Sequence, residues 1–235
     1  MNVKIKRKSE SYKKAPPKSF DELIESLNSI CGKTFLELCD MCKVSLPIST
    51  VHGKGFAGEL IELCLGASAG NASIPDFPNL GLELKTVPVD DNLEPLESMF
   101  ISYAPLTNMR NLTFEQSSLF AKISRVLFVI IHAPRSESLE SRKVLGYFFY
   151  SPTKDEMSLI ARDFYELMEL VKTGQIECIT ARFGTVIQMR PKCANGKALT
   201  DCIGPLGVFI KTRPRGFYMR RKFIKELLKK YWITN

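Results

Sequence analysis

The segment DFPNLGLELKTVPV, Asp76–Val89, contains a short apolar run that predicts a β-strand. An acidic residue begins the segment, and a Glu-x-Lys triplet follows seven residues later. Successive side chains of a strand point to opposite faces, so Glu83 and Lys85 share one face while Leu82 and Leu84 share the other. We expect the leucine face to pack in the core, which leaves the charged face free for chemistry.

The residue types Asp76, Glu83 and Lys85 are those that a metal-assisted phosphodiester hydrolase needs. Carboxylates bind a hard divalent cation through oxygen, and an ammonium group stabilises a pentacovalent phosphate or orients an attacking water. An exposed strand that merely alternates charge is the structural alternative, because a bare Glu-x-Lys triplet is a weak motif.

A third carboxylate is expected to complete the metal shell. The preceding segment FAGELIELCLGASAG, residues 56–70, predicts a helix whose polar side carries Glu59 and Glu62. The spacing does not choose between these two acids, and a solvated helix face is the alternative for both. The sequence lacks a nucleotide-binding P-loop and has no Ser-His-Asp or Cys-His arrangement, which excludes those hydrolase classes.

The composition is that of a globular, basic protein. The chain has 235 residues, of which 45% are hydrophobic and 25% charged, enough for one large or two small domains. A formal net charge of +8 indicates a polyanionic partner, with plain solubility as the alternative. No apolar run approaches the roughly 18 residues of a membrane span, so we expect a cytoplasmic protein with no membrane partner.

The seven cysteines have scattered spacings. Cys39 and Cys42 form one Cys-x-x-Cys pair, but no second pair stands at zinc-ligand spacing. Both fall on the apolar face of a predicted helix, so we expect buried free thiols in a reducing compartment.

The order of predicted elements indicates a mixed α/β fold with one principal core. Residues 1–18 predict a flexible basic tail, and residues 19–235 a single domain. Capping boxes at Ser19/Glu22, Thr34/Glu37 and Thr153/Glu156 mark three helix starts. Helices are expected near 20–31, 35–43, 56–66, 155–173 and 221–231, and further strands at 99–103, 126–131 and 144–150, with a hairpin of 176–182 and 186–190.

Two basic stretches predict contact with nucleic acid. The stretch KTRPRGFYMRRK, residues 211–222, has six basic residues and no acid, and it includes Arg215 and Tyr218. The other, MRPKCANGK, includes Arg190 and Lys192. Arginine forms paired hydrogen bonds to guanine, and lysine neutralises phosphates. A solvated basic surface is the alternative.

Five motifs, in order along the chain, resemble the MutH family of methyl-directed mismatch-repair endonucleases, which are related to restriction enzymes. They are KGFAGELIELCLGASAG, DFPNLGLELKTVPVD, PLESMFISYAPL, ITARFG with QMRPKCANGKAL, and PRGFYMRRKF. The resemblance covers nearly the whole chain from about Ser19. It implies a restriction-endonuclease-like α/β fold, with a mixed sheet flanked by helices and two arms forming a DNA-binding cleft.

The resemblance also implies an activity. The family nicks the unmethylated strand of double-stranded DNA at hemimethylated GATC sites, depends on Mg²⁺, and is stimulated by MutL after MutS detects a mismatch. We expect a monomer. A type II restriction endonuclease of the same fold and a non-catalytic methylation-sensing module are the alternatives.

Residue roles follow from the same resemblance. It selects Glu62 over Glu59, and departures at Ser124 and Gly196 leave these assignments standing. The implied metal ligands are Asp76, Glu83 and Glu62, the active-site lysines are Lys85 and Lys122, and the DNA-contacting residues are Lys54, Gly55, Arg190 and Tyr218, to which the basic stretches add Lys192 and Arg215.

Overall fold

A computed structural model of the protein describes residues 14–47, 55–70, 74–192 and 198–233. The chain divides into two compact units, each with its own sheet. Unit 1 comprises Met1–Glu97, Arg125–Tyr150 and Lys229–Asn235, and unit 2 comprises Ser98–Ser124 and Ser151–Leu228. The chain therefore passes from one unit to the other four times.

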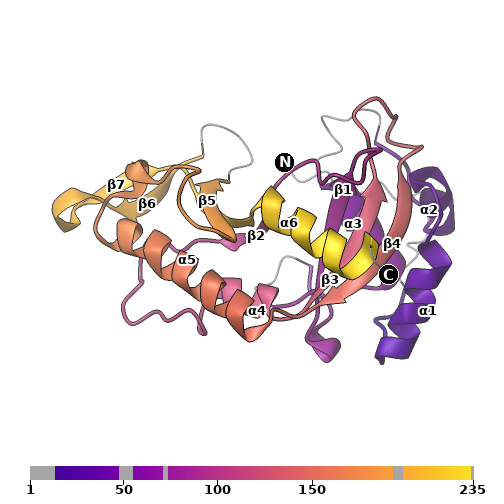
Figure 1. Ribbon diagram of the computed structural model, residues 1–235, viewed down its shortest axis with the longest axis horizontal. Coiled ribbons are helices and arrows are strands. Elements are labelled where there is room, and N and C mark those ends of the chain that lie inside the picture. Colours follow the sequence, from indigo (N-terminus) through magenta and orange to yellow (C-terminus); the bar gives the residue numbers. More distant parts are fainter. Residues whose placement is uncertain (1–13, 48–54, 71–73, 193–197, 234–235) are drawn as a thin grey trace. The chain divides into compact units, whose positions relative to one another are not determined.

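Unit 1 is built on a mixed three-stranded sheet with the order β1-β3-β4 (Figure 1). Strand β1 (Glu83–Val89) pairs in parallel with β3 (Val126–His132), which pairs in antiparallel with β4 (Lys143–Tyr150). All residues of β3 except the last are buried, which confirms the central strand predicted from its unbroken apolar run. Strand β1 lies at an edge of the sheet.

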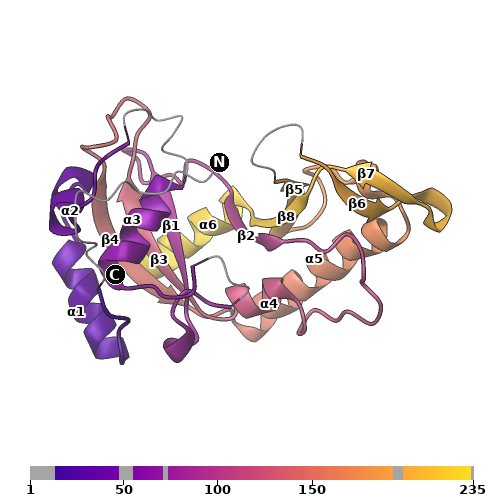
Figure 2. The same ribbon diagram turned by 180° about the vertical axis from the view of Figure 1, so that it is seen from behind.

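Three helices pack against one face of this sheet (Figure 2). They are α1 (Phe20–Ile30), α2 (Phe35–Met41) and α3 (Phe56–Leu65). The capping box predicted for α2 is present, because Thr34 and Glu37 bond each other's backbone amides. The resulting core joins the apolar sides of the helices to residues of all three strands.

The opposite face of the sheet is covered by aromatic rings from the chain's last turn, the π-helical segment η4 (Lys229–Ile233). Tyr231 stacks on Phe148 with ring centroids 5.8 Å apart. Trp232 lies directly over Gly146, where an added Cβ would come within 2.8 Å of the indole nitrogen. The sequence pattern had predicted one helix through this segment, but the α-helix ends at Leu228.

Unit 2 contains a second, antiparallel sheet. Its strand order is β2-β8-β5, and a separate two-stranded ribbon joins β6 to β7. Strand β8 is therefore central although it comes last in the chain. The strands are β2 (Met99–Tyr103), β5 (Ile187–Pro191), β6 (Thr200–Ile203), β7 (Phe209–Thr212) and β8 (Arg215–Met219).

The helices of unit 2 are α4 (Ser118–Ile123), α5 (Lys154–Lys172) and α6 (Arg221–Leu228). Helix α5 starts at the predicted capping box of Thr153 and Glu156 and packs against β5. Its apolar stripe reaches the centre of the unit, where the ring of Phe164 contacts those of Phe114 and Phe217.

The hairpin predicted from 176–182 and 186–190 is wrong. Ile176–Cys178 forms a 3-10 turn, and only Ile187–Pro191 becomes a strand, which pairs with β8. Tertiary contacts override the local pattern here, because the backbone amides of residues 185–187 bond a carboxylate of α5.

Most of the predicted basic tail lies outside the described residues, and its flexibility stays a prediction. Within the described part, Lys14 donates a hydrogen bond to Ser26 at 2.7 Å. Cys39 and Cys42 are buried free thiols, as expected. No helix in the described ranges is long and apolar enough to cross a membrane.

Candidate active site

Strand β1 separates charged from apolar side chains as its alternation predicts. Leu82 and Leu84 belong to the core of unit 1, which confirms the assignment of the two faces. The Lys85 Nζ atom donates a hydrogen bond to Glu83 Oε1 at 2.5 Å. Glu83 is itself fully buried, which the sequence did not predict, and the ammonium group offsets the free energy required to bury its charge.

A tight turn brings Asp76 to the same place. Phe77 and Leu82 bond each other's backbones across the 3-10 turn η1 (Pro78–Leu80), and Gly81 completes the turn at φ +58°. The chain thus folds back on itself, and Asp76 Oδ2 accepts a hydrogen bond of 2.8 Å from the amide of Leu84. The seven-residue separation of Asp76 and Glu83 in sequence becomes proximity in space.

Glu62 joins this group from helix α3, which packs against β1. Burial raises the pKa of its carboxyl group to about 7, and the charge of Asp76 is the next cause, while Lys85 acts in the opposite direction. Burial alone raises the pKa of Glu59. The charges of Asp76 and Glu83 thus act on Glu62, which favours Glu62 over Glu59 as the third acid, and its role in the site stays a prediction.

The chemistry of this donor set fits a magnesium ion. Three carboxylates supply only oxygen ligands, which Mg²⁺ prefers, and their mutual repulsion would fall if a divalent cation lay among them. Among the described residues, no three His, Cys, Asp or Glu side chains are already arranged to hold a metal ion. One oxygen of Glu83 accepts a hydrogen bond from Lys85, and one oxygen of Asp76 accepts one from a backbone amide, so these oxygens are already engaged. The assignment of Asp76, Glu83 and Glu62 as metal ligands stays a prediction.

The other residues predicted for catalysis or DNA contact near this site are Lys54, Gly55 and Lys122. Gly55 begins α3 at φ +88°, a conformation that favours glycine, while its neighbour Lys54 lies outside the described residues. Lys122 lies on α4, half-buried, in unit 2. The structure therefore brings together Glu62, Asp76, Glu83 and Lys85 within unit 1.

A cluster of cations and aromatic rings marks the sheet of unit 2. The pairing of β5 with β8 places the Arg190 guanidinium 5.5 Å from the centroid of the Tyr218 ring. Arg190 also donates a hydrogen bond of 2.8 Å to the Ser98 hydroxyl. Two residues predicted to contact DNA, far apart in sequence, thus lie against each other.

Two further aromatic residues extend this cluster, and the sequence reasoning missed both. The Phe100 ring packs edge-on against Tyr218 at 5.4 Å and against Tyr103 at 5.2 Å, and the Lys192 ammonium lies 4.8 Å from its centroid. Tyr103 is 56% exposed. Their position on a strand was expected, but no local pattern shows that β2 pairs with β8.

Arg215 differs from the other basic residues of unit 2. Its side chain is buried, and it forms an ion pair of 3.1 Å with Glu177. A hydrogen bond from Thr212, followed by the one from Arg215, lowers the pKa of the Glu177 carboxyl. This environment favours a structural role, and contact of Arg215 with DNA stays a prediction.

A mixed α/β unit with buried acids beside a strand lysine, in a chain whose second unit carries a cluster of cations and aromatic rings, is the arrangement of a nuclease. Comparison with known proteins narrows this class. A family profile described as "DNA mismatch repair enzyme MutH" matches residues 65–163.

Relatives match over almost the whole chain. The DNA mismatch repair protein MutH of Klebsiella pneumoniae subsp. pneumoniae is 41% identical over 93% of this chain and 95% of its own length. That of Vibrio campbellii is 41% identical over 94% and 98%, and that of Pectobacterium atrosepticum 40% over 92% and 94%. The chain belongs to the MutH family of DNA mismatch repair enzymes.

Proposed function

We propose that this protein is the strand-nicking endonuclease of methyl-directed mismatch repair, which cuts the unmethylated strand at hemimethylated GATC sites. The observation that carries the proposal is the group of Asp76, Glu83 and Lys85 at β1, joined by Glu62, in a chain of the MutH family. The proposal includes a monomer in the cytoplasm, dependence on Mg²⁺, and activation by MutL after MutS has bound a mismatch.

Each residue of the β1 group has a role in this proposal. Asp76, Glu83 and Glu62 would hold the Mg²⁺, which lowers the pKa of a bound water and offsets charge on the phosphate. Lys85 would orient the attacking water and share its charge between Glu83 and the scissile phosphate. The raised pKa of Glu62 means that this carboxyl holds a proton for part of the time at neutral pH, until a cation takes the proton's place. Lys122 is proposed as the second active-site lysine.

Recognition is assigned to unit 2. Arg190 would bond guanine in the major groove, and its contacts with Ser98 and Tyr218 hold the guanidinium in place before DNA arrives. Lys192 would neutralise a phosphate, as would Lys54, with Gly55 and Arg215 as further contacts. The two-armed, restriction-endonuclease-like cleft is part of the same proposal.

A supercoiled plasmid with a single GATC site tests the proposal. Hemimethylated, unmethylated and fully methylated forms would be incubated with Mg²⁺, with and without MutL. We expect nicked circles from the first two forms, faster with MutL, and an intact fully methylated plasmid. Linear product without MutL would indicate a type II restriction endonuclease instead. Site-specific binding without any cleavage would indicate a methylation-sensing module.

A further inference from the structure

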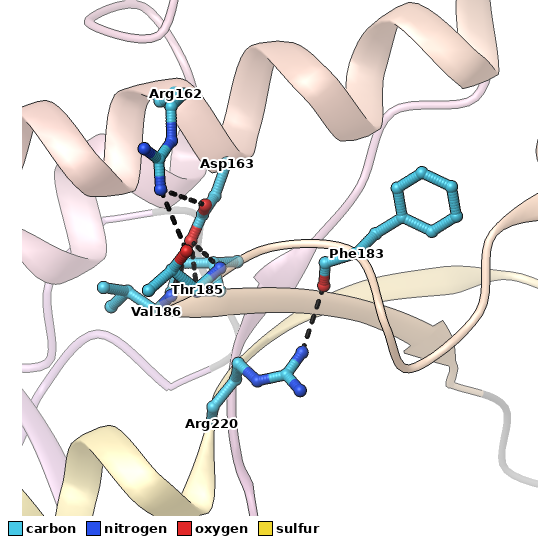
Figure 3. A network of polar contacts seen from close by, with 7 residues as sticks. Arg162, Asp163, Phe183, Thr185, Val186 and Arg220 are labelled. Atoms are coloured by element: carbon cyan, nitrogen blue, oxygen red, sulfur yellow. Dashed lines mark hydrogen bonds and ion pairs between the residues drawn. The ribbon is translucent and has the colours of Figure 1, made fainter.

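A buried aspartate of α5 holds the turn that leads into β5 (Figure 3). Asp163 is fully buried, and its Oδ2 atom accepts hydrogen bonds from three consecutive backbone amides. The donors are Thr185 at 2.9 Å, Val186 at 2.6 Å and Ile187 at 2.9 Å. Hydrogen bonds to an ionised acceptor are about twice as strong as neutral ones, so this carboxylate fixes where β5 begins.

The same turn is held from its other side by Arg220, which follows the end of β8. The Arg220 amide donates to the carbonyl oxygen of Val186 at 2.8 Å, and its guanidinium donates to that of Ala181 at 2.8 Å. The guanidinium also donates to the Phe183 carbonyl oxygen at 3.1 Å (Figure 3). Gly184 permits the turn, because it adopts φ +79° and an added Cβ would lie 1.8 Å from the Ile187 carbonyl oxygen.

Arg162 completes the network from the solvent side of α5 (Figure 3). Its guanidinium donates to the Thr185 hydroxyl at 2.9 Å and lies 3.9 Å from Asp163 Oδ1, an oxygen that has no hydrogen-bond partner among the described residues. The hydrogen bonds of Asp163 therefore go to the backbone of the turn. Through them, helix α5 fixes the backbone conformation at the start of β5.

The turn that leads into β5 sets the position of the cluster of cations and aromatic rings on the sheet of unit 2. Ile187 is the first residue of β5, and Arg190 comes three residues later on the same strand. In the observed register Gln188 pairs with Tyr218, which brings Arg190 over the Tyr218 ring. A slip of one residue would turn Arg190 to the opposite face of the sheet, so an anchor at Ile187 determines where the guanidinium points.

We propose that Asp163 is a positioning residue for base recognition, acting through the start of β5 on Arg190. The inference rests on the proposed function. It adds Asp163, a buried residue that cannot contact DNA, to the residues that determine sequence discrimination. Asp163 differs in this respect from the arginine that it positions, because it is fully buried and Arg190 is exposed.

The test compares Asp163→Asn with Glu166→Gln, a control that removes the same charge from an exposed position of α5. The measured quantity is the ratio of kcat/KM for nicking a GATC duplex and a duplex with one altered base pair. We expect Asp163→Asn to lower this ratio about tenfold, the low end of what one base contact supplies, and the control to change it less than about twofold. An unchanged ratio in Asp163→Asn would overturn the inference.

A double-mutant cycle separates positioning from a general loss of folding. If Asp163 acts through Arg190, then Asp163→Asn should lower discrimination less than about twofold in an Arg190→Ala background. An equal loss in both backgrounds, or an equal loss of rate on every substrate, would show a merely structural role and overturn the inference. If Asp163→Asn fails to fold, Arg220→Lys, which removes the guanidinium bonds to Ala181 and Phe183 and leaves the backbone bond to Val186, takes its place in the cycle.

Amide hydrogen exchange in the free protein gives a readout that needs no activity. The amides of residues 185–187 should exchange faster in Asp163→Asn than in the wild type, and unchanged exchange there would contradict the anchor itself. Failure of the proposed function is recognised separately, because it would appear as a wild-type protein that nicks both duplexes equally.

Discussion

The strand acids of unit 1 are buried, whereas the basic cluster of unit 2 has an exposed arginine that lies against aromatic rings. Glu83 is fully buried and bonded to Lys85, and Asp76 is tied to a backbone amide. Arg190 is exposed, and its contacts with Tyr218 and Ser98 orient it without covering it. We expect the buried acids of unit 1 to act in catalysis and the exposed Arg190 of unit 2 to act in selection of the DNA sequence. Substitutions in the two units should therefore fail in different ways.

The largest effect is expected from Asp76→Asn in unit 1. The asparagine oxygen can still accept the bond from Leu84, so the fold is kept while the charge is lost. Nicking should fall at least about a thousandfold, the upper range for removal of one electrostatic group, with DNA affinity within about threefold of wild type. Glu59→Gln serves as the control and should retain activity. Wild-type turnover by Asp76→Asn would contradict the assignment of catalysis to this unit.

In unit 2, Arg190→Ala should mainly change the choice of substrate. Loss of one base contact of about 1–3 kcal/mol predicts a tenfold to hundredfold fall in discrimination between GATC and altered sites. Competition binding with the two duplexes measures it. Arg182→Ala, an exposed arginine of the same unit, controls for charge and should affect all sequences equally. The contrast between the units would break down if Arg190→Ala abolished nicking of every duplex alike.

Arg215→Met sharpens the comparison within unit 2, because this arginine is buried and paired with Glu177. We expect a loss of stability of about 1.5 kcal/mol, the low end for a hydrogen bond to a charged group because the Glu177 carboxylate is exposed, without a change in discrimination. Urea unfolding measures the first quantity and competition binding the second. A weaker dependence of DNA affinity on salt would show in addition that Arg215 contacts phosphate, as proposed.

The smallest effect is expected from Glu62→Gln in metal-free protein. The pKa of Glu62 is about 7 in the folded state and about 4.5 when unfolded, so the folded state binds more protons between these values. Wild-type stability therefore falls as pH rises through this window, and the glutamine variant lacks that contribution. After allowance for solvent screening we expect the variant to gain about 1 kcal/mol at pH 8 relative to pH 4. Parallel pH profiles of thermal unfolding would contradict the raised pKa.

The helices were predictable because their signals are local. Thr34 with Glu37 and Thr153 with Glu156 form the expected capping boxes. At Ser19 only half of the capping box forms. The Ser19 hydroxyl accepts from the Glu22 amide, but the Glu22 carboxylate accepts from the amide of Lys18 instead of that of Ser19. By contrast, the strand assigned to 176–182 failed, because the backbone nearby is bonded by the side chains of Asp163 in α5 and Arg220 after β8, which no local pattern reveals.

The candidate site was likewise predictable only where it depends on residues that are close in the sequence. Strand alternation was enough to place Glu83 and Lys85 together, since it depends on neighbouring residues only. The choice of Glu62 over Glu59 depends on which side of α3 meets β1. The contact of Arg190 with Tyr218 depends on the pairing of β5 with β8, which joins two residues separated by 28 positions in the sequence. Such long-range contacts are set by the whole fold, so spacing alone could not give them.

The ion pair of Lys85 and Glu83 has a consequence for how such a chain evolves. Removal of one partner breaks an ion pair whose carboxylate is fully buried, which costs about 3–5 kcal/mol, a large fraction of a domain's stability. Once either residue has been lost, a neutral replacement of the other becomes favourable. The two positions should therefore be inherited as a unit, and a descendant that abandons catalysis should change both rather than one.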